Sequence, residues 1–181
     1  DDTILCLDEA YSDFVRQDEL ADLDTSRSNV VRFRTFSKAY GLAGLRVGYA
    51  IGNSTLISSF NKVRNHFGVN KIGQIAALAA LEDQEYLRKT IKAVGKSKLK
   101  IKGIFRELGF SSLDSYTNFV AINMGKDASY AKKILTELIK NKIFVRMPGV
   151  APLNSFIRVS AGQEEDLRNL EKVLAEIMRR N

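Results

Sequence analysis

The residues from position 34 to 48 combine one lysine with several groups that bind phosphate. This segment reads R-T-F-S-K-A-Y-G-L-A-G-L-R-V-G, with Lys38 near its middle. Arg46 carries a planar, permanently charged guanidinium that fits phosphate oxygens, and the hydroxyls of Thr35 and Ser37 can also ligate a phosphate. Three glycines in the segment permit a ligand to approach the backbone closely. The composition therefore indicates either an anion site around Lys38 or an ordinary glycine-rich turn.

The chemistry open to Lys38 differs between these two interpretations. A free lysine has a pKa of about 10.4 and is a poor nucleophile at neutral pH. A phosphate site and an acidic partner nearby would suit a lysine that forms a Schiff base with pyridoxal phosphate (PLP). A P-loop is excluded, because the order G-x-x-x-x-G-K-[ST] is absent. Composition alone leaves two possibilities: a Schiff-base lysine, or a surface lysine in a turn.

A polar tetrapeptide upstream supplies a candidate acidic partner. Residues 3 to 7 are apolar and predict a buried strand, which is followed by D-E-A-Y at positions 8 to 11. Ligands of open α/β sheets bind just outside the ends of the strands. We therefore expect the polar pair of Asp8 and Glu9, at the end of this strand, to lie where chemistry takes place.

The elements that position these residues alternate between strands and helices. Residues 29 to 34 and 45 to 51 predict two further strands, and Ser54 is a suitable N-cap for a helix that follows. An alanine-rich helix is expected over 73 to 81. Apolar residues at helical spacing from Leu87 to Leu108 predict one long helix, which Gly109 would end as a C-cap.

The remainder of the chain predicts a small α+β unit. Strands are expected over 119 to 123, 143 to 146 and 156 to 159, and amphipathic helices over 130 to 140 and 164 to 179. The fold class is therefore α/β, with residues 1–88 as one domain and residues 89–181 as a small α+β domain.

Composition and charge exclude several classes of function. The net charge of +7 suits anionic partners, but the lysine-rich stretch from 92 to 102 lacks the interleaved aromatics of a nucleic-acid site and is interpreted as a solvated helix face. No run approaches the roughly 18 to 20 apolar residues of a membrane span. A single cysteine, Cys6, and a single histidine, His66, leave no zinc cluster. We expect Cys6 to be buried, no metal, and a reducing, cytoplasmic compartment.

Three segments resemble a known family. The lysine segment is similar to the signature S/T-x-S-K-x-x-x-L-x-G-x-R-x-G of the fold-type-I PLP enzymes, in the class I/II aminotransferase branch. The D-E-A-Y tetrapeptide matches a second signature at the expected separation, and F-I-R-V-S-A-G at positions 156 to 162 matches a third. The first two are most similar in wording to the histidinol-phosphate aminotransferases. The matches to the lysine signature are Thr35, Ser37, Lys38, Leu42, Gly44, Arg46 and Gly48.

The resemblance implies a role for each candidate residue of the first segments. Lys38 would form the Schiff base and then carry a proton between the substrate and the cofactor, and Asp8 would keep the pyridine nitrogen protonated. Tyr11 would bond the cofactor's O3′. Arg46 would bind the phosphate with help from Thr35 and Ser37, although such hydroxyls often bond only the local backbone. The corresponding alternatives are a surface acid for Asp8 and a packing tyrosine for Tyr11.

The third match implies a substrate site. Arg158 aligns with the arginine that holds the acidic group of the substrate in this superfamily, and Arg146 aligns with a second arginine that would bind a substrate phosphate. An ordinary surface arginine is the alternative for Arg146. Two arginines on neighbouring strands would suit a dianion.

The implied activity is an amino-group transfer between histidinol phosphate and 2-oxoglutarate, in histidine biosynthesis. An aromatic amino-acid aminotransferase and a PLP-dependent threonine-phosphate decarboxylase share these signatures and stay open. The family's glycine-rich phosphate loop and its Asn-Pro turn are absent from these residues. We therefore expect the chain to be the C-terminal part of a homodimeric enzyme, with residues 1–88 as part of its large PLP-binding domain, and to be inactive alone.

Overall fold

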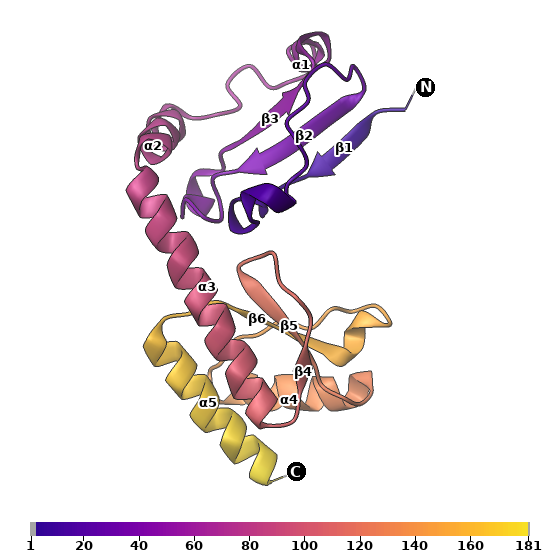
Figure 1. The fold of residues 1–181 in the computed structure, drawn as a ribbon, viewed down its shortest axis with the longest axis vertical. Helices are drawn as coiled ribbons and strands as arrows, with labels where there is room; N and C mark the ends of the chain where they lie inside the picture. The colour runs from indigo at the N-terminus through magenta and orange to yellow at the C-terminus, as the bar shows by residue number, and fades with distance from the viewer. Residues whose placement is uncertain (1–2, 181) are drawn as a thin grey trace. The chain divides into compact units, whose positions relative to one another are not determined.

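The computed structural model describes residues 3–180 and shows an α/β fold in two compact units. The first unit comprises Asp1–Ile91 and the second Lys92–Asn181, against a predicted boundary between residues 88 and 89. Each unit has its own three-stranded sheet (Figure 1). No helix in the described range is long and apolar enough to cross a bilayer. The two units are described separately.

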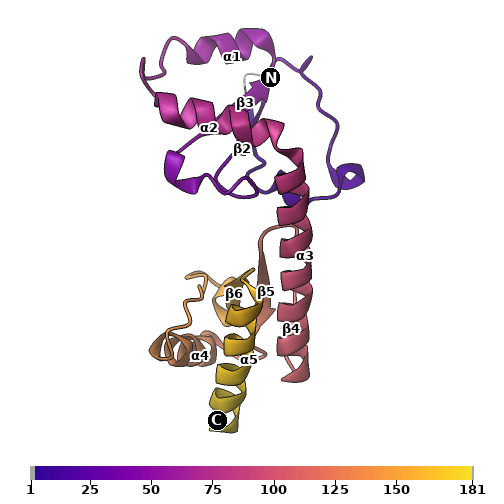
Figure 2. The same cartoon turned by 90° about the vertical axis from the view of Figure 1, so that its left-hand side faces the viewer.

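The sheet of the first unit contains β1 (Leu5–Asp8), β2 (Val30–Thr35) and β3 (Gly48–Gly52), in that order. Strand β2 pairs parallel to β1 and antiparallel to β3. The 3-10 turns η1 (Ser12–Phe14) and η2 (Gln17–Glu19) follow β1. Figure 2 shows this segment, in dark blue, and helix α1 (Ser54–Phe60) on opposite sides of the sheet. The predicted lysine segment follows β2 directly, so it begins where the parallel strands β1 and β2 both end.

Two boundaries in this unit differ from the prediction. Strand β3 begins at Gly48 rather than at residue 45, because Ala43–Leu45 forms the 3-10 turn η3 and Arg46 follows it with a left-handed φ of 57°. Helix α1 is capped by Asn53 rather than Ser54, since the Asn53 side chain accepts the Thr55 N–H. Strand β3 therefore begins three residues later than expected, and the cap of α1 lies one residue earlier.

Helices α2 (Lys71–Glu82) and α3 (Gln84–Glu107) complete the first unit and begin the second. Asn70 caps α2 by accepting the Gly73 N–H at 2.7 Å. Gly109, at φ 83°, and Phe110 close the C-terminus of α3 by donating their N–H groups to carbonyls of its last turn. A left-handed residue is the usual helix stop, and glycine adopts it without strain.

The second unit packs two helices and part of α3 around an antiparallel sheet. Its strands are β4 (Ser111–Ser112), β5 (Phe119–Asn123) and β6 (Phe156–Ser160), and its other helices are α4 (Ala128–Lys140) and α5 (Glu164–Arg179). The short turn η4 (Leu153–Ser155) precedes β6. The most deeply buried side chains of its core come from all three helices and both longer strands: Phe105, Ile122, Ile134, Leu138, Ile157 and Leu174.

Two expectations about burial and pairing were wrong. Residues 143 to 146 do not form a strand, because only Arg146 makes a bridge to the sheet, opposite Arg158. Cys6 is exposed rather than buried, because it lies on β1, an edge strand of its sheet, in which Leu5 and Asp8 are exposed as well.

Candidate functional site

The ends of two parallel strands bring Asp8 and Thr35 to one edge of the first sheet. Asp8 is the last residue of β1 and lies opposite Phe33, two residues before the end of β2. Parallel strands end at the same edge, where ligands of α/β sheets bind. The exposed Asp8 carboxylate accepts the Ala10 N–H at 3.0 Å, which shapes the turn that leads to Tyr11. An accessible carboxylate therefore stands at the strand end.

Lys38 lies in a tight turn directly after β2, close to Tyr11. Its Nζ is 5.3 Å from the centroid of the Tyr11 ring, within the range of a cation–π contact. Gly41, at φ 71°, donates its N–H to the Lys38 carbonyl at 3.0 Å. The neighbours Phe36 and Ala39 are buried and anchor the turn. The fold thus joins the two predicted segments at one place.

The proposed phosphate ligands lie around the same turn. Arg46 donates to the Ala43 carbonyl at 2.8 Å and to the Ser37 hydroxyl at 3.4 Å. The Thr35 hydroxyl accepts the Ser37 N–H at 3.0 Å and donates to the Val47 carbonyl at 3.4 Å. Thr35 therefore organises the backbone of the turn, which is the alternative role that its position allowed. The Ser37 hydroxyl accepts a hydrogen bond from Arg46, so these two proposed phosphate ligands contact each other in the turn.

An ionic cluster beside the turn was not predicted from the sequence. The Glu9 carboxylate accepts from Arg32 at 3.0 Å and from Arg34 at 2.9 Å. Burial alone would lower the pKa of Arg34, but the hydrogen bond and charge of Glu9, with a smaller contribution from Tyr49, raise it. Burial also raises the pKa of the nearby Asp13 carboxyl, against the opposing charge of Arg34. Two arginines two residues apart in an otherwise apolar strand were the signal that could have indicated this cluster.

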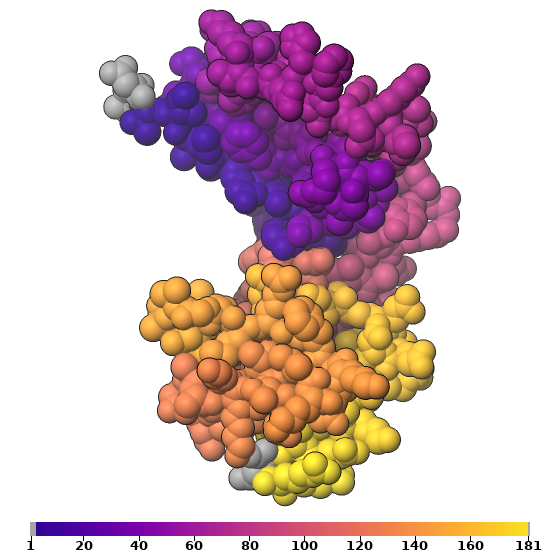
Figure 3. Space-filling view, turned by 180° about the vertical axis from the view of Figure 1, so that it is seen from behind, coloured from indigo at the N-terminus to yellow at the C-terminus, as the bar shows by residue number. Residues whose placement is uncertain are grey.

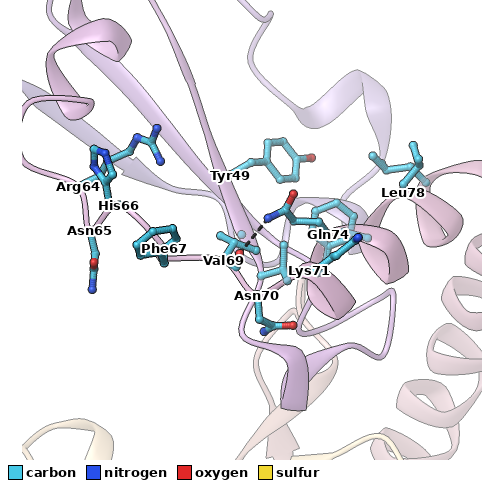
Figure 4. A pocket seen from close by; sticks show the side chains of 16 residues that line it. Tyr49, Arg64, Asn65, His66, Phe67, Val69, Asn70, Lys71, Gln74 and Leu78 are labelled. Carbon is cyan, nitrogen blue, oxygen red and sulfur yellow. Dashed lines mark hydrogen bonds between the residues drawn. The ribbon is translucent and has the colours of Figure 1, made fainter.

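A wide apolar groove of about 1270 Å³ lies in the first unit, and its lining includes Phe36 and Val47 from the segment around Lys38. Figure 4 shows its lining, which comes from β3, the loop of residues 64 to 70 and α2, with Gln74 bonded to the Val69 carbonyl at 2.9 Å. Phe67 is 91% exposed on its wall. Lys38 and Asp8 are not among its lining residues. This groove is therefore not the place where the predicted catalytic groups meet.

The two predicted substrate arginines lie together in the second unit. Arg158 on β6 and Arg146 exchange both backbone hydrogen bonds, at 2.6 and 3.1 Å. Directly opposed residues of an antiparallel pair point to the same face. The Arg158 guanidinium is 3.9 Å from the centroid of the Phe119 ring. The loop between the two arginines, which contains η4, projects from this unit and is seen in orange in Figure 3.

No acidic, cysteine or histidine side chains gather in threes to form a metal site anywhere in the described range. The predicted site residues form two groups in the structure. Those around Lys38 are assembled within the first unit and the two arginines within the second.

A family model described as aminotransferase class I and II matches residues 1–174. The chain belongs to this family. Histidinol-phosphate aminotransferase 2 of Oceanobacillus iheyensis is 37% identical over 178 residues, which are 96% of this chain and 48% of the relative. The histidinol-phosphate aminotransferase of Caldicellulosiruptor saccharolyticus is also 37% identical, over 95% of this chain and 48% of the relative.

A crystal structure of histidinol-phosphate aminotransferase from Sinorhizobium meliloti, in complex with pyridoxal-5′-phosphate, superimposes with a TM-score of 0.95. It is 46% identical, over 98% of this chain and 49% of that chain. The predicted fold class is confirmed: the α/β fold is that of a fold-type-I aminotransferase. The chain spans about half the length of the relatives it matches.

Proposed function

We propose that the full-length protein is a PLP-dependent aminotransferase that transfers an amino group between histidinol phosphate and 2-oxoglutarate, in histidine biosynthesis. The observation that carries the proposal is the turn around Lys38: the amine lies beside the Tyr11 ring, Tyr11 follows the accessible Asp8 carboxylate by three residues, and the same turn carries the hydrogen-bonded Ser37 hydroxyl and Arg46 guanidinium. Membership of the aminotransferase class I and II family supports it.

The chemistry of this donor set fits PLP. Ser37 and Arg46 supply a hydroxyl and a guanidinium for the phosphate ester, and Arg46 already orients its guanidinium toward the Ser37 hydroxyl. Lys38 supplies the amine for the aldehyde carbon, and Asp8 supplies a carboxylate for the ring nitrogen. When bound, PLP withdraws electrons from the substrate's α-carbon and so makes its proton acidic.

The residues of this chain would hold and move protons at defined atoms. Lys38 Nζ takes the proton from the substrate's α-carbon, because an amine released beside that carbon is a base in the right place. The Asp8 carboxylate holds a proton on the pyridine nitrogen. The Tyr11 hydroxyl bonds the O3′ oxygen. Arg46 and Ser37 fix the phosphate, which orients the ring.

The substrate assignment rests on the two arginines of the second unit. Arg146 and Arg158 face the same side of their strand pair, and two guanidinium groups suit a phosphate dianion better than a single carboxylate. The names of the relatives, which are histidinol-phosphate aminotransferases, support a phosphorylated amine as the donor.

A comparison of substrates with the purified full-length protein tests this assignment. We expect histidinol phosphate to yield glutamate from 2-oxoglutarate with a higher kcat/KM than phenylalanine or tyrosine, and threonine phosphate to release no carbon dioxide. Arg146→Gln should raise the KM for histidinol phosphate by about ten- to a hundredfold, from the loss of a charged hydrogen bond of roughly 1.5–3 kcal/mol. The exposed Arg168→Gln serves as the control. No turnover of histidinol phosphate would contradict the proposal.

We also propose a cytoplasmic homodimer for the full-length protein and no transamination by residues 1–181 alone. The first unit leaves a large apolar groove and an edge strand open within residues 3–180, and such surfaces usually pack against further protein. Measurable transamination by the 181 residues alone would refute the second of these proposals.

A further inference from the structure

Glu9 is held between two arginines on the neighbouring strand. Its side chain is 14% exposed, and that of Arg32 is 9% exposed. Arg32 Nη1 donates to Glu9 Oε1, and Arg34 Nε donates to Glu9 Oε2. We name these three residues the Glu9 clamp. Each oxygen of the carboxylate thus has its own cationic donor, which fixes the rotamer of Glu9 more tightly than one ion pair would.

The clamp determines which way the neighbouring Asp8 points. Successive side chains of a strand point to opposite faces, and the Glu9 N–H continues the parallel ladder by donating to the Phe33 carbonyl at 2.9 Å. Glu9 therefore lies on the face of Arg32 and Arg34, whereas Asp8 lies on the opposite face. A slip of one residue would exchange the two carboxylates between faces, and the clamp opposes it because Asp8 would then have to replace Glu9 between the arginines.

Arg32 extends the same restraint to the segment beyond Tyr11. Its guanidinium also donates to the Ala21 carbonyl at 3.0 Å and to the Asp22 carbonyl at 2.6 Å. The buried Arg32 guanidinium thus joins Glu9 to the carbonyls of Ala21 and Asp22, in the chain between Tyr11 and β2. The segment of residues 8 to 11 is thus held at Glu9, and its turn is closed by the bond from the Ala10 N–H to Asp8.

We infer that Glu9 is a positioning residue for the cofactor site, acting through the clamp to set the places of Asp8 and Tyr11 against Lys38. This inference rests on the proposed function, since Asp8 and Tyr11 matter to a cofactor only if PLP binds there. Glu9 itself lies on the other face of the strand and touches no reacting atom. Its contribution is to keep the Asp8 carboxylate where it holds the proton of the ring nitrogen.

The test uses the full-length protein with PLP and the variant Glu9→Gln, which keeps the shape of the side chain and removes its charge. The matched control is Glu19→Gln, an exposed glutamate on η2. Two properties are measured: the pH midpoint of the absorbance change of the bound cofactor, and the dissociation constant of PLP from its fluorescence. Circular dichroism checks that each variant is folded.

We expect Glu9→Gln to shift the pH midpoint by more than half a unit and to weaken PLP binding about tenfold, with Glu19→Gln unchanged in both. If Glu9→Gln does not fold, Arg34→Gln, which alters a more exposed member of the clamp, decides the question by the same readouts. A folded clamp variant with an unchanged midpoint and affinity overturns the inference. If the unaltered protein itself shows no cofactor absorbance, the proposed function fails and the inference fails with it, and the two failures are thereby distinguished.

Discussion

The two units of this chain differ in how completely they bury their own apolar residues. The second unit has a continuous core that includes fully buried side chains from α3, α4, α5, β5 and β6. The first unit has a smaller cluster around Phe36 and Val47. Many of its large apolar residues are exposed within the described range, among them Phe67, Ile72 and Leu78.

This difference separates a unit that is stabilised by its own packing from one that is organised by polar contacts. In the first unit the Lys38 turn is held by backbone hydrogen bonds and by the small buried cluster of Phe36 and Ala39, and the Glu9 clamp joins β1 to β2 beside it. Its apolar faces would contribute to stability only when other protein covers them. The comparison leads to three predictions, from the largest effect to the smallest.

The largest effect is expected when the two units are produced separately. Residues 84–181, which retain all of α3, should unfold in one cooperative thermal transition, because they contain the whole of the larger core. Residues 1–83 should show a broad, weakly cooperative change and bind a hydrophobic dye. Circular dichroism and calorimetry measure both. An equally sharp transition for residues 1–83 would remove the distinction between the units.

A smaller but still large effect is expected from Phe105→Ala. Phe105 is fully buried in the core of the second unit, so its truncation should cost about 3–5 kcal/mol of unfolding free energy through lost contacts and a cavity. The control is Leu99→Ala on the same helix, at a position 71% exposed, with an expected change below about 0.5 kcal/mol. Chemical denaturation measures both variants, and similar losses would show that α3 is not packed as described.

The smallest effect concerns Lys98, whose Nζ donates to the Ser115 carbonyl at 2.8 Å. Burial, and then the nearby charge of Lys102, lower the pKa of Lys98 below its ordinary value of 10.5. Between the lowered pKa and 10.5 the unfolded chain binds more protons, so this contribution to stability rises with pH in that window. Solvent screening keeps it under about 1 kcal/mol.

The Lys98→Met variant lacks this titration. Its stability relative to the native protein should therefore fall as the pH is raised from neutrality toward the ordinary lysine pKa. Parallel denaturation series at several pH values measure the difference. A constant difference across the series would contradict the assigned burial of Lys98.

Local sequence patterns predicted the regular elements well and the cluster of charges poorly. The bounds of β5 and α5 were predicted in full, because a short apolar run over 119 to 123 and an amphipathic repeat over 164 to 179 are local signals. The start of β3 was missed because Arg46 adopts a left-handed conformation that its residue type does not indicate. Residues 143 to 146 are apolar enough for a strand, but their pairing stops after one bridge.

The candidate site shows the same contrast between what sequence patterns predicted and what they missed. Lys38, Asp8 and Arg46 were singled out from their residue types, their order and the resemblance to a family signature. The fold places Lys38 beside Tyr11, which joins the two predicted segments. The Glu9 clamp was missed because its members are 23 and 25 residues apart in the sequence. Contacts of that range depend on the register in which β1 pairs with β2, and the two arginines in an otherwise apolar strand were their only local signal. The roles of all these residues toward PLP stay predictions.

The attachment of PLP to Lys38 tests the central claim most directly. The full-length protein is incubated with PLP, reduced with borohydride and digested, and the labelled peptide is identified by mass spectrometry. We predict that the label lies on Lys38, that Lys38→Ala abolishes it, and that the exposed control Lys62→Ala retains it. A label on another lysine, or an undiminished label in Lys38→Ala, would contradict the account.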